Sequence, residues 1–116
     1  MKIKRLAVVA ATVAVLGSSL VGPASAVSIK YSYSGSDYSV NSAGGTLVSA
    51  CDREKDGRAV RAEYTATGSS TNNSVTNNGD EPDCAGGTLS AVVYRHRIIE
   101  LNPIGASDYG SWVYPS

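Results

Sequence analysis

The chain is poor in the residues that most metal centres and catalytic sites use. It has one histidine, His96, and two cysteines. A zinc site needs three or four soft or nitrogen ligands, so one histidine and two disulfide-forming cysteines cannot supply it. The sequence also lacks the Gly-x-Ser-x-Gly turn that exposes a serine nucleophile. We expect His96 to be a packed strand side chain, and we predict a protein that is not an enzyme.

Helical periodicity is also missing. Short runs rich in Val, Tyr, Thr and Ile alternate with clusters of Gly, Asn, Asp and Ser about every ten residues. This rhythm is typical of a sandwich or barrel of short antiparallel strands. We therefore predict an all-β fold, a small antiparallel β-sandwich or a partly closed barrel with one disulfide, which follows a cleaved signal peptide.

The first 26 residues have the three parts of a secretory signal peptide. A basic start at 2–5 precedes an uncharged apolar run at 6–21, and Ala24-Ser25-Ala26 is a small-x-small cleavage site. A transmembrane anchor usually needs about 20 apolar residues or more, and it has no use for such a site. We predict a signal peptide over 1–26, one secreted β domain over 27–116, an extracellular location, and no membrane span after cleavage.

Removal of the signal peptide leaves a mildly acidic domain. The whole chain has ten basic and ten acidic residues, and three of the basic ones lie within 1–26, so seven against ten remain, a net charge of −3. Such a domain has no broad electrostatic attraction for nucleic acid or anionic lipid. Neither is expected as a partner.

The two cysteines, Cys51 and Cys84, are expected to form one disulfide, because oxidising compartments form and keep such bonds. They lack the Cys-x-x-Cys spacing of a redox-active pair. The bridge closes a loop of about 34 residues, for which the chain-entropy model gives roughly 3–4 kcal/mol. A domain that buries little surface benefits from such a bridge.

A hairpin is predicted from Thr46 to Thr67. Its turn lies at Asp56-Gly57, a favoured pair for a two-residue type I′ turn. This register places Asp52 opposite Arg61, and it places Cys51 on the apolar face, so that the disulfide faces the core.

Further strands are predicted along the chain. The clearest period-two alternation runs from Val27 to about Tyr33. A short strand is expected around Ser74 to Asn77, and a long one from Thr88 to Leu101. The long strand is expected to twist out of the core midway, because two arginines interrupt its apolar face.

The acidic residues Asp52, Glu54 and Asp56 are candidate calcium ligands. With Gly57 and Glu63 they match the acidic and glycine positions of an EF-hand loop. A glutamate at the third position fits such a loop poorly, and no amphipathic helix flanks it. A hairpin without metal, or calcium bound by the loop in another way, is therefore the expectation. A second acidic group could contribute to such a site: Asp80, Glu81 and Asp83. No other cofactor is expected.

Arg95, His96, Arg97 and Trp112 are the candidate binding residues. The arginines could present a basic stripe to a carboxylate, a sulfate or an acidic protein surface. Alternatively, they pair with acidic residues on neighbouring strands. Trp112 could stack on a sugar ring, or it could close a small core.

The sequence resembles a group of small secreted actinobacterial, Streptomyces-like proteins that are β-rich, contain one disulfide and have no assigned activity. The resemblance spans roughly Cys51 to Glu100. It rests on Cys51-Asp-Arg-Glu-Lys-Asp-Gly57, on Val60-Arg-Ala-Glu-Tyr64, on the second cysteine, and on Tyr94-Arg-His-Arg97 before Glu100. It implies a secreted β-sandwich-like domain with one disulfide and brings no catalytic residues.

The function predicted from the sequence is that of a secreted, non-enzymatic binding or interaction module. Its partner would be an extracellular protein, with enzyme inhibition as one form, or a polymer of the cell envelope. The alternative is a calcium-stabilised structural or surface protein.

Overall fold

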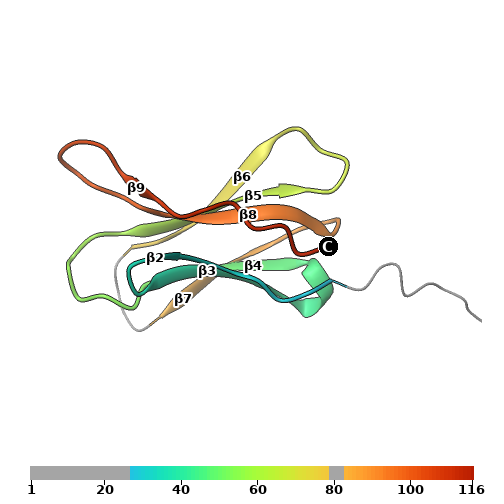
Figure 1. Cartoon of the computed structure of the whole chain (residues 1–116), viewed down its shortest axis with the longest axis horizontal. Helices are drawn as coiled ribbons and strands as arrows, with labels where there is room; N and C mark the ends of the chain where they lie inside the picture. Colours follow the sequence, from blue (N-terminus) through green and yellow to red (C-terminus); the bar gives the residue numbers. More distant parts are fainter. Residues whose placement is uncertain (1–26, 79–82) are drawn as a thin grey trace, which may run out of the picture.

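The computed structural model describes residues 27–78 and 83–116, and in this part of the chain eight short strands form two four-stranded antiparallel sheets. The sheets pack face to face, so the predicted β-sandwich is confirmed (Figure 1). The first sheet has the order β2-β3-β4-β7 and the second β6-β5-β8-β9. The first contains β2 (Tyr31–Ser34), β3 (Asp37–Ser42), β4 (Leu47–Cys51) and β7 (Cys84–Thr88). The second contains β6 (Asn72–Asn77), β5 (Val60–Ala66), β8 (Val93–Glu100) and β9 (Asp108–Tyr109).

The predicted signal peptide lies outside the described residues. A 3-10 turn, Ala43–Gly45, joins β3 to β4. Within 27–78 and 83–116, no helix has the length and apolarity needed to span a membrane.

The core between the sheets consists mainly of aliphatic side chains from the inner faces of β4, β5 and β8. Its buried members are Val48, Ala50, Val60, Ala62, Tyr64, Leu89, Val93 and Ile98. Tyr64 is the one aromatic residue among them, and the chain has no phenylalanine. Five other tyrosines are exposed on the surface, namely Tyr31, Tyr33, Tyr94, Tyr109 and Tyr114. Most of the aromatic rings therefore lie where a partner could reach them.

The predicted hairpin from Thr46 to Thr67 is wrong, because β4 and β5 belong to different sheets. The predicted type I′ turn does not form either, because Gly57 has a φ of 72° but Asp56 lacks the positive φ that such a turn requires. Asp56 Oδ1 instead accepts a hydrogen bond from the Arg58 amide at 3.0 Å. The chain before this bend is held by the buried Asp37 carboxylate, which accepts hydrogen bonds from the Arg53 and Glu54 amides. Residues 52–59 are consequently a crossover loop between the sheets.

The disulfide between Cys51 and Cys84 is confirmed, and it joins directly opposed residues of β4 and β7. The prediction that it faces the core is wrong. Val48 and Ala50 occupy the inner face of β4. Cys51 lies opposite Tyr38 of β3 and on the outer side of the sheet.

The other strand predictions are confirmed in part. The strand around Ser74 to Asn77 is β6. The alternation before Tyr33 forms β2 from Tyr31 onward, with its tyrosines exposed and Ser32 buried. The single strand from Thr88 to Leu101 is wrong, since β7 ends at Thr88 and β8 begins at Val93.

The prediction that the last long strand twists out of the core midway is wrong, because His96 and Ile98 stay fully buried, and a β-bulge instead shifts the register at the start of β8. Thr65 lies opposite Arg95, but the next residue of β5, Ala66, lies opposite Val93. Tyr94 is the extra residue, and its side chain is exposed. The bulge puts Val93 and His96 on the inner face and Arg95 on the outer one.

Gly110 is required where the C-terminal segment crosses the edge of the sandwich. A Cβ atom there would lie 2.6 Å from Ile98 Cγ2, and 2.7 Å from both Ser32 Oγ and the Tyr33 carbonyl oxygen. Ser32 cannot move aside, because it accepts a hydrogen bond from the Ile98 amide and donates one to the Ser111 carbonyl. We predict that Gly110→Ala lowers the free energy of unfolding by about 1–3 kcal/mol in urea titrations.

Gly86→Ala is the matched control. Its Cβ would meet first the flexible end of Leu47, at 3.1 Å, and we expect a change below about 1 kcal/mol. Equal losses in the two variants would contradict the crowding argument.

Candidate functional site

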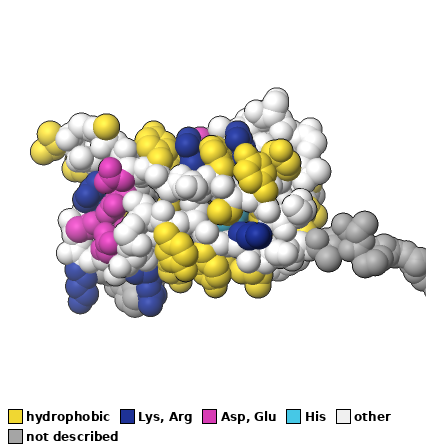
Figure 2. All heavy atoms as spheres, in the orientation of Figure 1, with side chains coloured by type: hydrophobic (Ala, Val, Ile, Leu, Met, Phe, Trp, Pro, Cys, Tyr) yellow, Lys and Arg dark blue, Asp and Glu magenta, His cyan; other side chains and the backbone are white. Residues whose placement is uncertain are grey.

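The outer face of the second sheet carries a row of alternating aromatic and basic side chains, which we call the arginine–aromatic stripe. Arg95 and Arg97 project from β8. The C-terminal segment lies beside this strand, because Val113 and His96 exchange two backbone hydrogen bonds of 2.9 and 3.1 Å. The stripe consists of Tyr109, Arg97, Trp112, Arg95, Tyr114 and Tyr94. Figure 2 shows hydrophobic and basic side chains side by side along the upper edge of the molecule.

Cation–π contacts hold the stripe together. The Arg95 guanidinium carbon lies 3.8 Å from the centre of the Trp112 ring, and that of Arg97 lies 4.4 Å from it. Arg97 also lies 4.6 Å from the ring centre of Tyr109. Tyr94 and Tyr114 extend the row with an edge-to-face pair at 5.4 Å. Three of the four binding residues predicted from the sequence, Arg95, Arg97 and Trp112, are thus brought together.

The two arginines differ in their polar partners. Arg97 forms an ion pair with Glu63 at 2.8 Å, as the alternative of cross-strand pairing predicted. Arg95 donates from Nε to Thr65 Oγ1 at 3.4 Å. Within the described part of the chain, no carboxylate lies within 4.0 Å of Arg95. The guanidinium of Arg95 therefore offers donors to an external anion.

His96, the fourth predicted binding residue, does not belong to this surface. Its side chain is fully buried on the inner face of β8, as expected for a packed strand residue. The Asn41 amide group donates to the Ser28 carbonyl, so its oxygen accepts from the Lys30 amide and from His96 Nε2 at 3.1 Å. Ring nitrogen Nδ1 then accepts from the Ser39 hydroxyl at 2.7 Å.

This arrangement fixes His96 as a neutral imidazole, and burial lowers its pKa to about 4. Ser39 and His96 have the separation of a nucleophile and a base, but both side chains are 0% exposed. A substrate cannot reach either of them in this structure.

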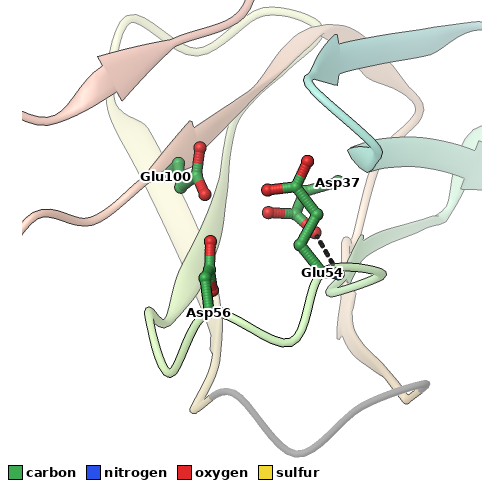
Figure 3. Close-up of side chains that lie close together, drawn as sticks. All are labelled: Asp37, Glu54, Asp56 and Glu100. Atoms are coloured by element: carbon green, nitrogen blue, oxygen red, sulfur yellow. Dashed lines mark hydrogen bonds between the residues drawn. The ribbon is translucent and has the colours of Figure 1, made fainter.

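Four carboxylates meet at one end of the sandwich, and we call them the carboxylate cluster: Asp37, Glu54, Asp56 and Glu100. Asp37 begins β3, Glu54 and Asp56 lie in the crossover loop, and Glu100 ends β8. One oxygen from each lies within 4.8 Å of the other three. In Figure 3 the four groups face a common space from both sides.

The local structure positions each member of the cluster. Glu54 folds back to accept a hydrogen bond from the Ser36 amide at 2.8 Å. A side chain at Gly35 would collide with this carboxylate, and Gly35 has a φ of 61°. Glu100 is approached by Arg58 at 3.7 Å, and Arg58 also pairs with Asp108 at 3.1 Å.

Burial changes the acidity of two members. It raises the pKa of Glu100 to about 7, with a further increase from its hydrogen bond with Asp56. Burial also raises the pKa of Asp37 to about 6. The hydrogen bond from the Arg53 amide lowers this pKa, whereas the adjacent charges of Asp52 and Glu54 raise it further.

The calcium ligands predicted from the sequence are only partly in the cluster. Glu54 and Asp56 belong to it, whereas Asp52 lies outside the four and accepts a hydrogen bond from the Glu54 amide at 3.2 Å. Asp83 is exposed and also outside the cluster, and Asp80 and Glu81 lie outside the described residues. Asp37 and Glu100 were not predicted, although both lie at strand ends, where polar residues of different strands can meet.

A second aromatic group, also not predicted, lies on the first sheet. Tyr31, Tyr33 and Tyr38 contact one another with ring centres 5.3–5.8 Å apart. Tyr33 and Tyr38 lie directly opposite each other on β2 and β3. Among the described residues, no arginine or lysine lies over these three rings, so variants of this group can serve as controls for variants of the stripe.

Comparison of the chain with protein-family models, with curated proteins and with solved structures finds no match. The resemblance to secreted actinobacterial proteins therefore stays a prediction.

Proposed function

We propose that the protein is an exported, non-enzymatic binding module that attaches to an anionic polymer of the cell envelope through the arginine–aromatic stripe. The observation that carries this proposal is the position of two guanidinium groups against one indole ring, at 3.8 and 4.4 Å, on the outer face of a sheet. Stacking on an aromatic ring restricts an arginine while its N–H edges stay directed outward. The disulfide is compatible with an oxidising compartment.

The chemistry of the stripe favours an acidic chain as its ligand. Planar guanidinium groups match carboxylate and phosphate groups, and aromatic rings supply contact area with little loss of conformational freedom. The stripe follows a sheet surface, so it suits an extended polymer with repeated charges. Because the mature chain has a net charge of −3, local contacts rather than net charge must provide the attraction.

The test is cosedimentation of the purified protein with insoluble cell envelope from the organism that produces it. We expect Trp112→Ala and Arg95→Gln each to raise the dissociation constant about tenfold or more, which corresponds to about 1.4 kcal/mol. Arg95→Gln removes the charge of a partly exposed side chain, so it should leave the fold intact. Raising the salt concentration should weaken binding by the wild-type protein.

Tyr33→Ser is the matched control, because it removes an exposed ring from the other sheet. Its binding should equal that of the wild type. Retention that survives Trp112→Ala but is lost in Tyr33→Ser would move the site to the first sheet. Capture of one defined protein from culture medium, lost with Ile104→Ser, would instead favour an inhibitor-like role, because Ile104 is 87% exposed in the loop before β9.

A further inference from the structure

The carboxylate cluster concentrates negative charge where the two sheets meet. Asp37 comes from the first sheet, Glu100 from the second, and Glu54 and Asp56 from the loop that connects them. Acidic side chains gather at this end of the molecule in Figure 2. Carboxylates this close repel one another unless a counter-charge or protons lie between them. Arg58 approaches Glu100 but is shared with Asp108.

A second observation points to a missing partner inside the cluster. Asp37 is 0% exposed, and its Oδ1 accepts hydrogen bonds from the Arg53 and Glu54 amides at 2.6 and 3.1 Å. Its other oxygen, Oδ2, is buried and has no hydrogen-bond partner. Figure 3 shows an Asp37 oxygen directed into the space that the four groups share. A buried carboxylate oxygen without a donor is costly, so a bound cation or a proton must lie at this point, and Asp52 Oδ2 nearby is also buried without a partner.

The donor set identifies the class of ligand. All four groups offer oxygen donors. Hard cations such as calcium and magnesium prefer oxygen ligands, whereas zinc and copper favour nitrogen and sulfur ligands. Calcium binds oxygen at 2.3–2.6 Å, so ligands on opposite sides of the ion are about 4.6–5.2 Å apart, whereas for magnesium this span is about 4.0–4.2 Å. The limit of 4.8 Å among the four oxygens fits a shell of calcium size.

We propose that Asp37, Glu54, Asp56 and Glu100 form a calcium-binding site that clamps the two sheets together at one end of the sandwich. The site does not depend on the arginine–aromatic stripe, which lies on the outer face of β8. Its ligands come from three segments that are distant in sequence, so the ion stabilises the folded chain and not the unfolded one. Water and backbone carbonyls complete the six to eight ligands that calcium takes.

Thermal unfolding of the purified protein in EDTA, in 5 mM CaCl2 and in 5 mM MgCl2 tests the proposal. For a dissociation constant of about 0.1–1 mM, common for extracellular calcium modules, calcium should raise Tm by about 5–10 °C. Magnesium should raise it less. Calorimetric titration with CaCl2 should give one site per chain.

Two charge-removing variants keep the local hydrogen bonds. Glu54→Gln can still accept from the Ser36 amide, and Asp56→Asn from the Arg58 amide. We expect the double variant to lose the calcium shift while its Tm in EDTA equals or exceeds that of the wild type, because repulsion is reduced. Glu63→Gln, which removes a charge on the outer face of β5, should keep the full shift.

A wild-type Tm that is the same in EDTA and in calcium would overturn the proposal and leave shared protons as the partner of the buried oxygens. A calcium shift that survives in the double variant would overturn it as well. So would equal shifts with magnesium and calcium in every variant, because that pattern reports ionic screening and not a site.

Discussion

Replacing His96 with alanine is expected to lower the free energy of unfolding by about 3–5 kcal/mol, and Tm by roughly 15–30 °C. The side chain is fully buried and bonds to Ser39 and Asn41, which come from the opposite sheet. Removing the imidazole leaves a cavity, and the buried Ser39 hydroxyl loses its hydrogen-bond acceptor. Urea titration with wild-type and variant protein measures the loss.

Tyr94→Ala is the control for this prediction, because Tyr94 lies in the same strand but is 47% exposed. It should cost less than about 1 kcal/mol. If His96→Ala costs no more than Tyr94→Ala, the buried histidine does not hold the two sheets together.

The same histidine should make stability depend on pH. Its pKa is about 4 in the folded protein and about 6.5 when unfolded, so the unfolded chain binds the proton more readily. The stabilisation is therefore complete above about pH 6.5 and is lost as pH falls through 4, a change of about 3 kcal/mol. The difference in free energy of unfolding between wild type and His96→Gln, measured as a function of pH, separates the contribution of the histidine from that of the nearby carboxylates. In NMR, the His96 ring signals should not shift between pH 8 and 5.5.

Removing the disulfide with Cys51→Ala and Cys84→Ala together is expected to cost about 3–4 kcal/mol, and to lower Tm by roughly 15–25 °C. The two residues are 33 positions apart in sequence, and the bridge ties the edge strand β7 to β4. Two of the five residues of β7 are glycines, so side-chain packing contributes little to its pairing.

Hydrogen exchange locates the effect of this double variant. We expect the amides of β7 to lose protection first, while β5 and β8 keep theirs until global unfolding. A uniform loss across both sheets would show that the disulfide stabilises the whole sandwich and not its edge. A Tm within a few degrees of the wild type would contradict the prediction itself.

The sequence by itself determined that the secondary structure is made of strands, that the two cysteines pair, and that certain exposed residues share one side of a strand. Short β-branched runs between turn residues are sufficient to predict strands, and two cysteines permit one intramolecular pairing. The spacing of Arg95 and Arg97 placed both on one side of a strand. The single histidine was correctly expected to be packed, and its alternative role as a binding residue is wrong because its side chain is fully buried.

Tertiary structure decided which face of each strand is buried and which distant residues meet. A period-two pattern shows that Tyr31 and Tyr33 share a face, but only the packing of the sheets directs Ser32 inward. The Asp-Gly pair is compatible with a hairpin turn and with a bend in a crossover loop, and hydrogen bonds from the loop to Asp37 favour the crossover. Asp37 and Glu100 join the carboxylate cluster from positions 63 residues apart (100 − 37), since the two sheets bring their strand ends to one end of the sandwich. Such long-range proximity depends on burial summed over the whole chain, which no local pattern contains.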